Sequence, residues 1–404
     1  MHATYAFGIL ILISFLGARF VFRRKNIFSP LNYFFSSGLI YIFLGLYLGK
    51  HGLNILSVQV LEGLTPLISL GLGWIGFLFG FQLERKYLHR FPGNYIGFSF
   101  LQALFVFFLV FVVIFLALKL FFNSYSVFLL YGMAVALGLL ASMNSPALLN
   151  AASSKIPEKG NYYYLARFLA SISAFWGIVG LAFISSFWHF PFFESKIFEK
   201  GLLFLLVSTA FPFILGYFFH FLTLKKTSEQ DLLVYILGLV FFVSGAAFYF
   251  NLPTLYVSMV MGITYSNLTK IHEKIYPLFL LTEKPLYVVL LVLIGALWDF
   301  NISYEAAILV ALLFVVRIIG YVFPLRLFQK ILNFPFPLPA VLGLCFLSYG
   351  GIGVAFAVSI KLSYPLALTD VFLSSALIVI ILSDILGPWA LKLSIFRLDS
   401  EKKT

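Results

Sequence analysis

The sequence predicts an all-α integral membrane protein with about thirteen transmembrane helices in two inverted repeats, in which one broken helix from each repeat crosses the other. Three observations support this prediction. The composition is that of a membrane protein, the chain is a succession of apolar segments, and helix-breaking residues interrupt two of these segments at corresponding places.

The composition excludes a water-soluble protein. Of the 404 residues, 62% are hydrophobic and 10% are charged, whereas about one quarter of a soluble domain is charged. Phe alone supplies 51 residues, and its side chain carries no polar atom that would need a partner in lipid.

Apolar segments of about 17 to 25 residues, long enough to cross a bilayer, are separated by charged or Pro/Gly-rich breaks. The segments begin near Tyr5, Asn32, Gly63, Asn94, Ser126, Tyr164, Phe198, Asp231, Pro253, Tyr276, Ser303, Leu338 and Asp370. The connections are short, so any chemistry must take place within the membrane region.

The cationic residues are distributed unevenly over the connections. The odd-numbered connections carry Arg23, Arg24, Lys25, Arg85, Lys86, Arg90, Lys155, Lys159, Lys225, Lys226, Lys270, Lys274, Arg326 and Lys330. The even-numbered connections hold Lys50, Lys196, Lys200 and Lys361, with Lys119 nearby. Because loop Lys and Arg remain on the cytoplasmic side, we expect a multi-pass protein of the cell (inner) membrane with the N-terminus outside and the C-terminus in the cytoplasm.

Other classes of function find little support. The net charge is +12, but the longest basic run is Arg23-Arg24-Lys25, which does not indicate nucleic-acid binding. Cys345 is the single cysteine and lies in an apolar run, and the six histidines are dispersed, without the spacings of a metal site. We therefore expect no metal, no cofactor and no enzymatic activity.

Two segments contain residues that interrupt a helix. In the fifth, the run 132–140 is followed by Ser142-Met143-Asn144-Ser145-Pro146; in the twelfth, the run 341–347 is followed by Ser348-Tyr349-Gly350-Gly351-Ile352-Gly353. Unwound backbone at membrane depth is tolerated where it is buried or lines a cavity, so paired breaks indicate a binding site. The breaks lie seven segments apart and so cross the membrane in opposite directions, as inverted repeats require. The alternative is chance, because Pro and Gly are common in membrane helices.

Four motifs occur in an order that resembles the monovalent cation:proton antiporters of the sodium/hydrogen exchanger type. They are the apolar run 70–84 ending in Gly80-Phe81-Gln82-Leu83-Glu84, Asn144-Ser145-Pro146-Ala147, Glu283-Lys284-Pro285-Leu286 through Ile294-Gly295, and the glycine-rich stretch 348–353. The resemblance implies exchange of sodium or potassium for protons by alternating access. It also implies a homodimer formed through a helical panel.

Together with the repeats, the resemblance implies a division of the chain into domains. Panel/dimerisation helices would occupy 4–82 and 231–297, a linker helix 198–222, and a cytoplasmic tail 392–404. The transport core would occupy 94–187 and 303–391, with broken helices near 142–147 and 348–353.

The sixth segment departs from the family pattern. There the family carries an Asp-Asp, Asn-Asp or Gln-Asp pair that holds the ion and the proton. Aligning Gly177-Ile178-Val179 with the family places Ser173-Ala174 at this pair, and no Asp or Glu lies between Lys159 and Glu194. The chain is therefore identified as a degenerate member that lacks the acidic ion-binding pair.

Charges inside a membrane segment need a reason, since each costs roughly 2.5 to 3.5 kcal/mol at the bilayer centre. Arg317 is followed by Tyr321, where the family often shows Arg followed by Gly-Lys. It either holds an anion, acts as a fixed positive charge in place of the missing lysine or, as we favour, bonds the free carbonyls of the broken helices. Glu283 either pairs with Lys284 near the cytoplasmic edge or carries a proton. Asp384 either meets interfacial water or is a displaced proton site.

The breaks offer neutral oxygen ligands in place of carboxylates. We expect an ion site formed by Ser142, Asn144, Ser145, Ser173, Arg317, Tyr321 and Ser348, with Asp384 and Glu283 as possible proton carriers. Hard cations accept hydroxyl and carbonyl oxygens, whereas the N-termini of half-helices attract anions. The leading hypothesis is secondary active transport of sodium or potassium against protons. The alternative is a carrier of an anion or small solute, or a non-transporting relative, on the same scaffold.

Overall fold

The computed structural model describes residues 3–19, 30–152, 161–188, 197–223, 229–269, 272–300, 304–332, 338–364 and 367–400. Every regular element in these residues is a helix, which confirms the predicted all-α class. The chain divides into two compact units, each assembled from stretches that are distant in sequence.

The first unit comprises Met1–Val21, Ile40–Phe91 and Leu181–Trp298. Its helices are α1 (Ala3–Ala18), α3 (Ile40–Leu48), α4 (Val58–Gly63), α5 (Thr65–Gln82), α6 (Arg85–Leu88), α11 (Ile197–Thr223), α12 (Glu229–Tyr249), α13 (Thr254–Leu268) and α14 (His272–Leu297).

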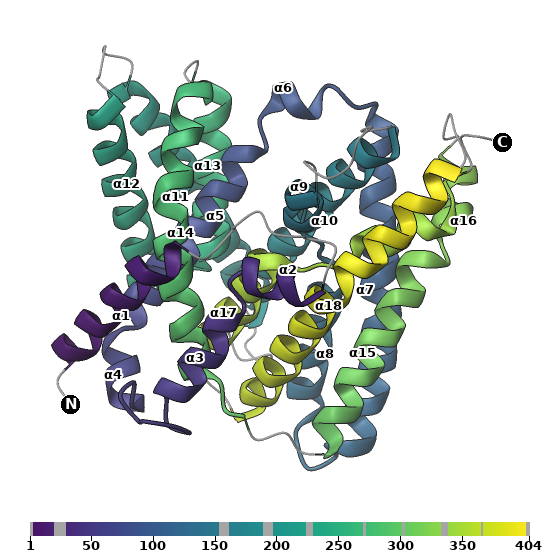
Figure 1. Ribbon diagram of the computed structural model, residues 1–404, viewed down its shortest axis with the longest axis horizontal. Helices are drawn as coiled ribbons and strands as arrows, with labels where there is room; N and C mark the ends of the chain where they lie inside the picture. The colour runs from purple at the N-terminus through teal and green to yellow at the C-terminus, as the bar shows by residue number, and fades with distance from the viewer. Residues whose placement is uncertain are drawn as a thin grey trace. The chain divides into compact units, whose positions relative to one another are not determined.

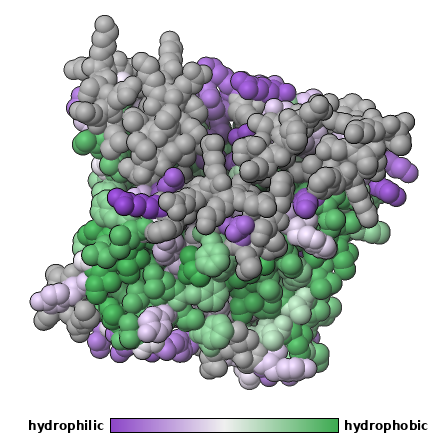
Figure 2. All heavy atoms as spheres, in the orientation of Figure 1, coloured by the Kyte–Doolittle hydropathy of each residue, from purple (hydrophilic) through white to green (hydrophobic). Residues whose placement is uncertain are grey.

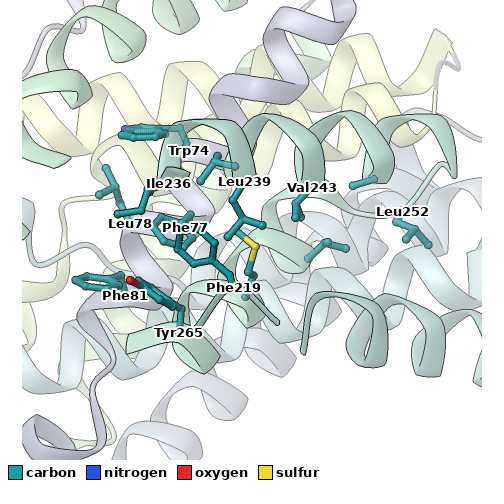
Figure 3. Close-up of a cluster of buried hydrophobic side chains, with 14 of the residues drawn as sticks. Trp74, Phe77, Leu78, Phe81, Phe219, Ile236, Leu239, Val243, Leu252 and Tyr265 are labelled. Carbon is teal, nitrogen blue, oxygen red and sulfur yellow. The ribbon is translucent and has the colours of Figure 1, made fainter. Parts of the chain in front are cut away.

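Glycines on α5 allow its backbone to touch that of α13, as small residues do between membrane helices. A Cβ atom at Gly76 would lie 2.3 Å from the carbonyl oxygen of Leu255, and one at Gly80 would lie 2.1 Å from that of Met259. An aromatic cluster continues this contact (Figure 3): the rings of Phe81 and Tyr265 have centroids 6.1 Å apart.

The second unit comprises Phe22–Leu39, Pro92–Gly180 and Asp299–Thr404. Its helices are α2 (Pro30–Ser36), α7 (Gly93–Phe121), α8 (Val127–Ser142), α9 (Ala147–Ala152), most of α10 (Asn161–Trp188), α15 (Tyr304–Val322), α16 (Leu325–Ile331), the 3-10 helix η1 (Ala340–Phe346), α17 (Gly350–Ser363) and α18 (Ala367–Ser400). The helix α18 runs on to Ser400, through most of the stretch predicted as a tail.

In the second unit α7 packs against both α8 and α15 (Figure 1). The Phe107 and Phe111 rings stack along α7 with centroids 6.0 Å apart, and Phe111 meets Tyr131 of α8 at 5.3 Å. On the α15 side, Gly320 brings its backbone close to Val106 of α7. These contacts fix the helices that carry the first break and Arg317.

Seven helices among the described residues are long and apolar enough to cross a membrane, or eight when the bent pair η1 and α17 is counted as one span. Three further apolar helices are shorter, at 10–17 residues. On the face seen in Figure 2, hydrophobic residues cover most of the described surface. The chain is a multi-pass membrane protein; the count of about thirteen spans stays a prediction.

Candidate functional site

The first break separates α8 from α9. Met143 has extended backbone angles, φ −86° and ψ 144°, and Pro146 has no N–H with which to continue the helical hydrogen bonds. Carbonyl oxygens at the end of α8 are thereby released from the helix. The side chains of Asn144 and Ser145, which the sequence singles out, are 2% and 4% exposed.

The second break separates η1 from α17, and the two helices bend by 60°. Gly350 has φ +54°, and a Cβ atom there would lie 2.7 Å from the Ser145 hydroxyl oxygen, so only glycine fits without strain. The Ser145 N–H donates to the carbonyl oxygen of Ser348 at 2.9 Å. The two predicted breaks are therefore present and contact each other directly.

Arg317 on α15 joins both breaks and is completely buried. Its Nε donates to the carbonyl oxygen of Ala141 at 3.0 Å, and its Nη1 donates to that of Leu347 at 2.6 Å. Its Nη2 donates to the carbonyl oxygens of Met143 and Phe346, each at 3.0 Å, and to Oδ1 of Asn144 at 3.0 Å. The positive charge therefore lies at the C-terminal ends of α8 and η1, where helix dipoles favour a cation.

Two tyrosines hold this arrangement. The Tyr321 hydroxyl, one turn along α15, donates to the carbonyl oxygen of Ser142 at 2.7 Å and lies 3.3 Å from that of Ala141. The Tyr349 ring lies under the Arg317 guanidinium, whose Cζ is 3.8 Å from the ring centroid. Sequence reasoning missed this role of Tyr349, although its place inside the second break was a signal.

Asp384 on α18 is also completely buried, and so does not meet interfacial water. Its Oδ1 accepts from the Ser348 hydroxyl at 2.7 Å and from the Tyr349 N–H at 2.9 Å. Its Oδ2 accepts from the Gly350 N–H at 3.1 Å. The carboxylate thus caps the N-terminus of α17, where a negative charge is favoured.

Ser173 on α10, which the sequence singles out, contacts the first break. Its hydroxyl oxygen accepts from Nδ2 of Asn144 at 3.0 Å and donates to the carbonyl oxygen of Ala170 at 2.9 Å. Gly177, one turn further, lets α10 approach, since a Cβ atom there would overlap the Met143 side chain. Ser173 therefore contributes a hydroxyl to the first break.

Two predicted residues contribute differently. The Ser142 hydroxyl donates to Leu139 within α8 at 2.8 Å, so Ser142 joins the site through its carbonyl oxygen. Glu283 belongs to α14 in the first unit, and its side chain lies outside the described residues. Within the described ranges, no group of three or more His, Cys, Asp or Glu side chains is arranged to hold a metal ion.

No protein-family description matches the sequence, and no curated protein matches it. The chain is similar to the solved structure of the sodium proton antiporter MjNhaP1 from Methanocaldococcus jannaschii at pH 8, with a TM-score of 0.65 and 18% identity over 98% of this chain and 100% of that one. It is also similar to an electron-microscopy structure of the same antiporter, with a TM-score of 0.68 and 15% identity over 98% of each chain. The chain therefore has the fold of a sodium/proton antiporter along nearly its whole length, as the resemblance in its motifs predicts.

Proposed function

We propose that this protein is a secondary transporter that exchanges a monovalent cation for protons by alternating access. The observation that carries the proposal is the similarity of almost the entire chain to a sodium proton antiporter. Paired helix breaks that meet within one unit are also the expected form of a carrier site.

The oxygen atoms at the breaks suit a hard cation such as sodium or potassium. Ser145, Ser173 and Ser348 place buried hydroxyls there, and Asn144 adds an amide oxygen. The Ala141 carbonyl oxygen accepts from both Arg317 and Tyr321, whereas the Met143, Phe346 and Leu347 carbonyl oxygens accept from Arg317 and each have a second lone pair. We propose these groups, together with Tyr321 and the Ser142 carbonyl, as the lining of the ion site.

The buried Arg317 is a poor anion receptor, which weighs against the alternative carrier. All three of its nitrogens donate to protein oxygens, and Tyr349 covers one face of the guanidinium. An anion would have to displace several of these bonds. What favours the alternative is the Ser173-Ala174 pair, which offers no carboxylate.

We further propose that the core stretches 94–187 and 303–391 move against the panel stretches 4–82 and 231–297, with 198–222 as linker. On this proposal the panel forms a homodimer in the inner membrane, with the N-terminus outside and the C-terminus in the cytoplasm.

The test uses the purified full chain in proteoliposomes that contain a trapped pH dye and carry a preset proton gradient. Sodium, lithium or potassium is added outside. The test variant is N144A/S145A, in the first break. Its matched control is N123A/S124A, which removes the same side-chain types from exposed neighbouring positions of the second unit.

We expect at least one cation to dissipate the gradient with the wild type and the control, and at least tenfold less dissipation with N144A/S145A. If no cation dissipates the gradient with folded wild-type protein, the result would contradict antiport and favour the alternative carrier or a non-transporting relative.

A further inference from the structure

Arg317 and Asp384 are the two charged residues that the described part of the chain buries completely. They lie at the same pair of breaks: Arg317 bonds the carbonyls at the ends of α8 and η1, and Asp384 bonds the N–H groups at the start of α17. The other titratable groups against them are Tyr321, whose hydroxyl donates to the Ser142 carbonyl, and Tyr349, whose hydroxyl lacks a hydrogen-bond partner in the described structure. Arg317 and an ionised Asp384 together carry no net charge.

The bonds of the Asp384 carboxylate are unequally shared between its oxygens. An ionised carboxylate has about four acceptor positions, two on each oxygen. Oδ1 accepts from Ser348 and Tyr349, with Gly350 at a longer 3.4 Å, whereas Oδ2 accepts only the 3.1 Å bond from Gly350. One acceptor position of Oδ2 is therefore open to a proton or a cation.

The backbone of α18 supplies a second oxygen beside this carboxylate. Pro388 lies within α18 and has no N–H, so the carbonyl of Asp384 lacks the donor that a helix provides four residues later. Gly387 lies against the second break, since a Cβ atom there would be in van der Waals contact with Cβ of Ser348 at 3.7 Å. A carboxylate and a carbonyl that has lost its regular helical donor thus belong to one residue, where α18 meets the break.

We propose that Asp384 is the carboxylate that binds the transported proton, in place of the missing acidic pair, and that the proton and the cation compete for it. This inference rests on the proposed antiport. One proton from water forms a bond to Oδ2, and the site then carries a charge of one. Loss of that proton to water and binding of one monovalent cation give the same charge, so the net charge of the site does not change when one ligand replaces the other.

Protonation also acts on the break itself. A neutral carboxyl is a weaker acceptor than a carboxylate, since hydrogen bonds to ionised groups are roughly twice as strong. The hydrogen bonds between Asp384 and the N-terminus of α17 therefore weaken when the proton binds. The same side chain thereby links ligand exchange to the position of a half-helix.

The variant that tests this role is Asp384→Asn, which keeps the size and one acceptor oxygen but binds no proton. Its control is Asp370→Asn on the same helix, where the carboxylate pairs with Lys361 and is 40% exposed. Both are compared with the wild type for cation-evoked proton flux in proteoliposomes over a range of pH, after gel filtration and thermal unfolding have shown that each is folded.

For the wild type and D370N we expect the cation KM to rise about tenfold for each unit fall in pH, as competition with one proton requires. D384N should lose at least nine-tenths of the proton flux. If Asp384 were only a structural cap, D384N would be less stable to heat, but any flux that remained would keep the wild-type pH dependence of KM.

Infrared difference spectra provide a readout that does not depend on turnover. Adding the transported cation to wild-type protein should remove a protonated-carboxyl C=O band, and this change should be absent in D384N and present in D370N. Normal coupled flux and an unchanged band in D384N would overturn the inference while antiport stands. Absence of flux from folded wild-type protein with every cation would overturn both.

Discussion

The backbone N–H of Ser145 donates to the backbone carbonyl of Ser348 at 2.9 Å, so a main-chain hydrogen bond joins the two unwound segments. The pairing brings Gly350 against Ser145 and leaves no room for a side chain at position 350. The two breaks are therefore in direct backbone and side-chain contact.

We expect Gly350→Ala to destabilise the protein by about 1–3 kcal/mol, because a non-glycine residue would have to hold a left-handed backbone and its Cβ would meet the Ser145 hydroxyl. Thermal unfolding in detergent measures the loss. Adding Ser145→Gly should recover the part due to the clash but not the part due to the backbone. Gly93→Ala is the control, since nothing lies within 4 Å of a Cβ atom there; equal effects at the two glycines would contradict the explanation.

Arg317→Ala should cost about 3–5 kcal/mol of stability, as expected when one member of a buried charge network is removed. Arg317→Lys should recover only part of this, because a lysine ammonium cannot reproduce the fork that bonds four carbonyls and Asn144. The measurement is the unfolding midpoint, with Arg326→Ala at an exposed position as the control. A lysine variant as stable as the wild type would show that charge alone suffices.

The two site tyrosines should respond differently to loss of their hydroxyls. Tyr321→Phe removes the 2.7 Å bond to Ser142 and should cost about 1 kcal/mol. Tyr349→Phe removes a hydroxyl without a hydrogen-bond partner in the described structure and should change stability by less than about 0.5 kcal/mol. Both variants keep the ring, so each is a control for the other; a larger loss for Tyr349 would show that its hydroxyl has a ligand.

A transport cycle through one carboxylate should exchange one cation for one proton. Within the described side chains, Asp384 is the one fully buried acid, and the site carries the same charge with either ligand. The rate of exchange in proteoliposomes should therefore not change when a potassium gradient with valinomycin imposes a membrane potential. A rate that increases several-fold with potential would indicate that more than one proton moves per cation.

The sequence was sufficient to predict the helical class and the position of both breaks, because Pro146 and the glycines around Gly350 act on the local backbone. It also identified Arg317, since an isolated charge in an apolar segment is conspicuous. The contact between Ser348 and Asp384 spans 36 residues and two helices, and no local pattern encodes it. The number of spans is also hard to predict from the sequence. Hydropathy reports how apolar a segment is but not how long its helix is, and α13 is a helix of only 15 residues.

The second unit is assembled from stretches of the chain that are synthesised at different times. Residues 92–180 leave the ribosome well before 299–404, and much of the first unit is made in the interval. The carbonyls of Ala141 and Met143 receive the Arg317 guanidinium only after α15 has been synthesised, and the cap of α17 requires α18, made last of all. A chain arrested near residue 300 would already contain the Ser173 partner of Asn144, but the carbonyls of Ala141 and Met143 would lack their Arg317 donors.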